Sequence, residues 1–76
     1  MQCDRLTNAE IEQGIQLTAA ALKAERQYVA FLAQGRDFPP DPLVRNHMIE
    51  SHQKIIANLE KDMEDLLAVR AKRQLA

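Results

Sequence analysis

Apolar residues recur along two segments of the chain in alternating steps of three and four residues. In the first segment, about residues 8–34, the repeating positions are Ile11, Ile15, Thr18, Leu22, Glu25, Val29 and Leu32. In the second, about residues 42–73, they are Ile49, His52, Ile56, Leu59, Met63 and Leu66. A seven-residue repeat of this kind is typical of helices that pack along a continuous seam. The pattern therefore predicts an all-α protein with two helices.

Local signals mark both ends of the first helix. Thr7 and Glu10 have the spacing of a capping box, in which each side chain binds the backbone N–H of the other residue. Leu6 and Ile11 occupy the two positions of a hydrophobic staple around the same boundary. Gly35 supplies the residue that most often adopts a left-handed conformation just past a helix end. We therefore expect the helix to begin near residue 8 and to end near residue 34.

The second helix has an equally clear beginning. Asp41 is a favoured N-cap residue, and Pro42 suits the first helical position because its missing N–H has no role there. The connecting loop, residues 35–41, is short, and a short loop joins antiparallel neighbours. The fold class is accordingly an antiparallel two-helix hairpin, or αα-hairpin, within a single domain of residues 1–76. Phe38 in the loop either caps the hairpin core or is an exposed anchor for a partner.

The first helix carries a second row of small and apolar residues beside its seam. The members of this second stripe are Gly14, Leu17, Ala21, Ala24, Tyr28 and Phe31. A lone hairpin leaves such a stripe in water, and the small residues would let another helix approach closely. We therefore expect a homodimer that forms a four-helix bundle. Two alternatives stay open: the stripe binds a different protein, or it only broadens the buried face of a monomer.

Polar residues interrupt both seams at Glu25 and His52. If the chain folds back near residue 38, these two side chains fall opposite each other. The pair has two interpretations. It is a pH-sensitive latch, because imidazole gains or loses its charge near neutral pH. Alternatively, it sets the register of the helices, as a buried asparagine does in coiled coils.

Size and composition narrow the setting of the protein. A chain of 76 residues rarely buries a self-sufficient core without a metal, disulfides or a partner subunit. Cys3 is the only cysteine, so no disulfide forms within the chain. No segment has the roughly 20 apolar residues that span a membrane, and no apolar leader is visible. We expect a cytoplasmic protein without a membrane partner.

Catalytic and metal-binding patterns are missing from the sequence. His47 and His52 are five residues apart, about 140° around a helix, so they do not share the face that a metal pair requires. No phosphate-binding glycine loop, dinucleotide fingerprint, zinc pattern or nucleophile elbow is present. We therefore predict that the protein is not an enzyme and that it holds no cofactor and no metal.

Basic residues gather where the two ends of the hairpin should meet. Arg70, Lys72 and Arg73 end the second helix, and Arg5 precedes the first. These four are candidate phosphate contacts, and the RNA-binding helical-hairpin dimer Rop is a precedent by analogy of architecture only. The formal net charge of −1 and an acidic band before residue 70 weigh against a nucleic-acid track.

These observations rank three functions. The first is a non-enzymatic protein–protein interaction module, a regulator, inhibitor or adaptor that acts as a homodimer and binds a further protein. The second is a nucleic-acid-associated accessory factor that uses the four basic residues. The third is a structural assembly subunit whose dimer interface is its entire function.

Overall fold

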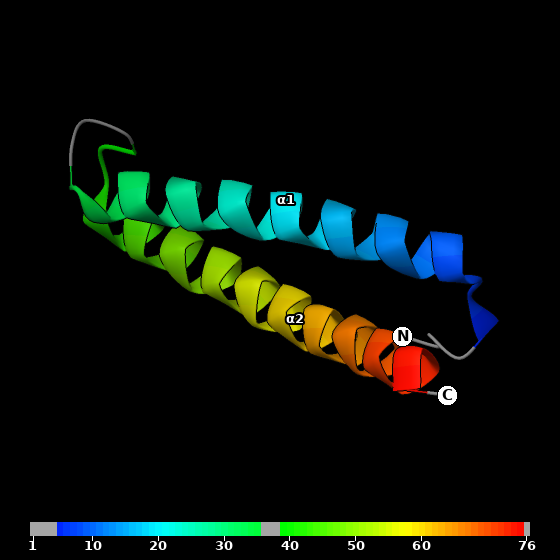
Figure 1. The fold of residues 1–76 in the computed structure, drawn as a ribbon. Helices are drawn as coiled ribbons and strands as arrows, with labels where there is room; N and C mark the ends of the chain where they lie inside the picture. Colours follow the sequence, from blue (N-terminus) through cyan, green and yellow to red (C-terminus); the bar gives the residue numbers. More distant parts are fainter. Residues whose placement is uncertain (1–4, 36–38, 76) are drawn as a thin grey trace.

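The chain forms two long helices packed side by side in opposite directions. The computed structural model describes residues 5–35 and 39–75. Helix α1 is Asn8–Ala33 and helix α2 is Pro42–Leu75, and these described residues contain no β-strand. In Figure 1 the first turn of α1 and the last turn of α2 lie at one end of the molecule, and the connection lies at the other. The expected antiparallel hairpin is confirmed.

The capping box at the start of α1 is also confirmed. The Thr7 backbone N–H donates to Glu10 Oε1 over 2.8 Å, and the Glu10 N–H donates to Thr7 Oγ1 over 3.1 Å. The bond from the Thr7 backbone to the Glu10 carboxylate lowers the pKa of Glu10 below its ordinary value. Leu6 packs against the buried Ile11, as the staple predicts.

Helix α1 ends one residue before the expected boundary. Gln34 is the C-cap, and the N–H of Gly35 donates to the Leu32 carbonyl over 3.2 Å. Gly35 has φ 68°, the left-handed conformation that side chains disfavour. This residue therefore ends the helix and turns the chain toward α2.

The first turn of α2 holds the end of the loop. Asp41 Oδ1 accepts from the Leu43 N–H over 2.9 Å, which completes the expected N-cap. The guanidinium of Arg45 donates to the Pro39 carbonyl over 2.9 Å, and Pro39 is buried. Helix α2 then continues to Leu75, two residues past the expected end.

The seam between the helices follows the predicted repeats. Every expected seam position is buried or half-buried. The best-covered side chains lie at both ends of α1, with Ile11 and Leu32, and late in α2, with Leu66. Thr18 and Leu22 are also buried. The core is therefore a single narrow line of side chains between two helices.

A molecule of two helices is elongated and exposes much of its surface. Its extents are 52 × 16 × 15 Å and its radius of gyration is 16.0 Å, whereas a compact chain of this length has about 11 Å. Its accessible surface is 5711 Å², compared with about 4700 Å² for a compact protein of this mass. About 1000 Å² more than usual is thus available for contacts with other molecules.

Candidate interaction surface

The second stripe of α1 separates into two rows with different environments. The residues next to the seam are half-buried, at Gly14 and at seven-residue steps after it: Gly14, Ala21 and Tyr28. The residues farther round the helix are exposed, again in seven-residue steps: Leu17, Ala24 and Phe31. Leu17 exposes 63% of its surface, although it is a large apolar side chain. Only the outer row is therefore open to a partner.

Gly14 packs within the hairpin. A Cβ atom added at Gly14 would lie 3.4 Å from both δ-methyl groups of Leu66 on α2. Gly14 follows Ile11 by three residues and so adjoins the seam. The sequence interpretation, in which Gly14 admits a helix from another chain, is therefore corrected: its close neighbour belongs to the same chain.

Tyr28 likewise has its main described partner in the hairpin. Its ring meets the ring of His52 edge-on, with centroids 4.8 Å apart and an interplanar angle of 66°. On its other side it stacks near Phe31, with centroids 6.4 Å apart. Tyr28 thus joins the seam to the outer row of α1.

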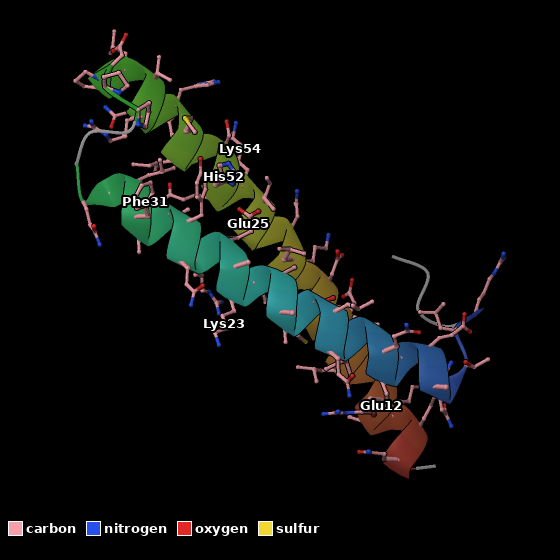
Figure 2. The ribbon with its side chains drawn as sticks, turned by 90° about the horizontal axis from the view of Figure 1, so that it is seen from above. Glu12, Lys23, Glu25, Phe31, His52 and Lys54 are labelled. Atoms are coloured by element: carbon pink, nitrogen blue, oxygen red, sulfur yellow. The ribbon has the colours of Figure 1, made fainter. Side chains whose placement is uncertain are left out.

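Glu25 and His52 meet across the seam, as the expected register predicts. His52 Nδ1 lies 2.5 Å from Glu25 Oε2, and both side chains are half-buried. Figure 2 shows them facing each other between the helices, whereas Lys23 lies on the outer side of α1. The carboxylate therefore holds one imidazole nitrogen in place, and the ring of Tyr28 packs beside it.

Helix α2 adds exposed apolar residues of its own. Leu43 exposes 78% of its surface, Ile55 42% and Leu67 38%, and Val44 is also exposed. The sequence pattern indicated Ile55 and Leu67 as apolar positions outside the seam. It did not single out Leu43 and Val44, although both lie just before the α2 repeat begins and so could have been placed off the seam.

The candidate phosphate contacts lie in different surroundings. Arg70 Nη1 lies 3.4 Å from Glu12 Oε2, and Arg73 Nη1 donates to Asn8 Oδ1 over 2.9 Å. Arg5 and Lys72 are exposed. A hollow of about 150 Å³ lies at this end of the hairpin, lined by Asn8, Ile11, Glu12, Arg70, Arg73 and Gln74. An anion in the hollow would have to compete with the Glu12 carboxylate for Arg70.

Three further points concern predicted sites. Within residues 5–35 and 39–75, no three metal-ligating side chains gather in one place. Neither helix, over its described length, combines the length and the hydropathy that crossing a bilayer requires. Phe38, the candidate loop anchor, lies outside the described residues.

Comparison with known proteins adds no functional assignment. No family model, no curated protein and no solved structure matches this chain. The argument for function therefore starts from the exposed apolar residues and the charges around them.

Proposed function

We propose that the protein is a non-enzymatic interaction module, a homodimer of helical hairpins that regulates, inhibits or links another protein. The observation that carries the proposal is the exposed outer row of α1, Leu17, Ala24 and Phe31. Rows of large apolar side chains on a small protein usually mark a binding surface. In a dimer this row becomes part of the core of a four-helix bundle.

The surface area of the hairpin supports the same proposal. A stable interface buries about 800 Å² on each partner. The chain exposes 5711 Å², about 1000 Å² above the value for a compact protein of 8.6 kDa. Association of two copies would therefore bring each chain close to the usual balance of buried and exposed surface.

The surroundings of His52 support a non-enzymatic role. A general acid or base works in a pocket that excludes water and admits a substrate. His52 instead lies in the seam, where Glu25 binds its Nδ1 and Tyr28 packs against its ring. The hollow at the hairpin end has neither histidine nor cysteine among its lining residues.

A bundle of this kind acts by occupying or bridging a surface. Leu43 exposes 78% of its surface and lies two residues before the half-buried Arg45, nearly opposite the seam. It therefore stays outside the hairpin core. The proposal assigns the loop end of α2, with Leu43, to the contact with the second protein.

Light scattering of the whole chain at micromolar concentrations tests the homodimer. The proposal predicts a mass of twice the 8.6 kDa of one chain. A mass of one chain up to about 100 μM would contradict it, because functional interfaces are commonly occupied at far lower concentrations.

The second protein requires a separate test. Immobilised parent protein and a Leu43→Lys variant are exposed to the same host extract, and captured proteins are identified by mass spectrometry. We expect one protein to bind the parent and to be lost with Leu43→Lys, while light scattering gives both chains the same mass. Equal capture by both chains would contradict the assignment of Leu43.

A further inference from the structure

We infer that a second copy of the chain covers one particular side of the hairpin and does so with its loop at the opposite end. The side, here called the apolar face, consists of Leu17, Ala24, Phe31, Val44 and Ile55, with the half-buried Met48 between the last two. The inference rests on the proposed homodimer. It adds the participation of α2, the exclusion of Leu67, and the orientation of the two chains.

The position of one ion pair identifies the two sides of the hairpin. Arg26 Nη2 lies 4.0 Å from Glu60 Oε2. Each of these residues directly follows a seam residue, Glu25 on α1 and Leu59 on α2, and so lies about 100° round its helix from the seam. Residues that directly follow the seam positions therefore share one side of the molecule. Leu67, which follows Leu66, belongs to that side.

Residues that directly precede the seam positions must then share the other side. On α1 these are Leu17 before Thr18, Ala24 before Glu25, and Phe31 before Leu32. On α2 they include Met48 before Ile49 and Ile55 before Ile56, and Val44 likewise precedes the half-buried Arg45. Both helices consequently contribute to one apolar face, which extends from Leu17 to the loop end.

The charge on this side changes toward the chain ends. Glu10, Asp62 and Asp65 each directly precede a seam residue, so they lie on the same side as the apolar face but nearer the termini. Two copies with their loops at the same end would place these carboxylates against one another, which is unfavourable. Two copies with their loops at opposite ends keep the acidic groups apart.

The spacing of the outer row suits a two-fold axis at Ala24. Leu17 and Phe31 lie seven residues on either side of Ala24, so antiparallel α1 helices would pair Ala24 with its own copy and Leu17 with the partner chain's copy of Phe31. The small Ala24 side chain allows close approach at the axis. A side of the hairpin that is 52 Å long and 16 Å wide offers on the order of 800 Å², the usual contribution of one partner.

Matched lysine variants test which side is used. Ile55 and Leu67 are both α2 residues with similar exposure, 42% and 38%, on opposite sides of the hairpin. By sedimentation equilibrium we expect Ile55→Lys to weaken the dimer at least about tenfold and Leu67→Lys to change it less than about threefold. Leu17→Lys tests the α1 side and should resemble Ile55→Lys. Circular dichroism of each variant verifies that the helices persist.

A cysteine variant tests the orientation. In a Cys3→Ser background, Ala24→Cys should form a disulfide between subunits on mild oxidation, because the two copies of the residue meet at the axis. Ala33→Cys, which follows Leu32 and lies on the other side, is the matched control and should remain a thiol. A dimer in which Ala24→Cys stays reduced would overturn the antiparallel arrangement.

The outcomes separate the inference from the proposal on which it rests. If the parent chain has the mass of a monomer, both fail. If the parent is a dimer and Leu67→Lys weakens it while Ile55→Lys does not, the homodimer stands and the assignment of the apolar face is wrong.

Discussion

The two halves of the hairpin place apolar and polar side chains in opposite ways. In the half that contains the chain ends, Ile11 and Leu66 form a buried cluster with Leu6, Ile15 and Val69 around it. Polar contacts from Arg70 to Glu12 and from Arg73 to Asn8 lie outside that cluster. The loop half instead has Glu25 and His52 between the helices and Phe31, Val44 and Ile55 in contact with solvent.

This difference indicates which half depends on association. A cluster with apolar residues inside and ion pairs outside is stable by the ordinary hydrophobic effect. A half with a polar pair inside and apolar residues outside gains less from closing on itself, although Leu32 is fully buried there. A second chain on the apolar face would supply the missing burial. The loop half is therefore the part that we expect to change most when the dimer forms.

The largest effect should come from the terminal cluster. Leu66→Ala removes a side chain that is 1% exposed and leaves a cavity beside Ile11, so we expect a loss of about 2–4 kcal/mol in the free energy of unfolding. Denaturant unfolding at a fixed chain concentration measures the loss. Leu67→Ala is the adjacent control and should change stability by less than about 1 kcal/mol. Equal losses at the two positions would show that the terminal half has no distinct core.

The polar pair of the loop half should have a smaller effect. His52→Ala leaves the half-buried Glu25 carboxylate without its imidazole partner, so we expect a loss of about 1–2 kcal/mol. A double-mutant cycle with Glu25→Ala should give a coupling energy of at least about 0.5 kcal/mol. Additive losses would show that the contact contributes nothing of its own.

The same pair allows its two interpretations to be compared. Replacing Glu25 and His52 together by leucine removes both polar groups, so stability should remain within about 1 kcal/mol of the parent. If the pair sets the register, that variant should lose its single oligomeric mass by sedimentation velocity. A uniform dimer of unchanged mass would count against a role in register.

Gly14→Ala should stabilise the terminal half slightly. Alanine favours a helix by about 1 kcal/mol over glycine, and its Cβ would make ordinary contact with Leu66 at 3.4 Å. Thermal unfolding should therefore give a higher midpoint than the parent at equal concentration. Gly35→Ala is the matched control, because its φ of 68° disfavours a side chain and the midpoint should fall. A lower midpoint for Gly14→Ala would mean that this part of the seam has no room for a methyl group.

The smallest effect concerns pH and the capping box. The pKa of Glu10 is lowered by the Thr7 N–H, so its contribution to stability is complete above the pKa in the unfolded chain. That contribution is lost as the pH falls through the lower pKa of the folded state, roughly between pH 5 and pH 3. Unfolding curves over this range should be less steep in pH for Glu10→Gln. Identical pH dependence in the two chains would contradict the role of the cap.

The helices and their register could be predicted because local patterns determine them. The box of Thr7 and Glu10, the N-cap at Asp41 and the repeats of the seam each depend on residues close in sequence. The meeting of Glu25 with His52 followed from the position of the loop. Each of these inferences required only helical geometry and a turn of known place.

The division of the second stripe could not be predicted from the same pattern. Periodicity places Gly14 and Leu17 in one stripe, but the rotation of α1 against α2 decides that Gly14 meets Leu66 and Leu17 meets solvent. The contacts of Arg70 and Arg73 with α1 also depend on how far α2 extends, and the sequence estimate ended that helix two residues early. Rotation and length are set by tertiary packing, which a single sequence does not report.

The apolar face can be tested most directly by isotope-filtered NMR on a dimer mixed from labelled and unlabelled chains. Such spectra record only contacts between subunits. The account predicts cross-subunit contacts between the Phe31 ring and the Leu17 methyl groups and at the Ile55 methyl groups, with none at Leu67. Cross-subunit contacts at Leu67 and none at Phe31, Leu17 or Ile55 would contradict it.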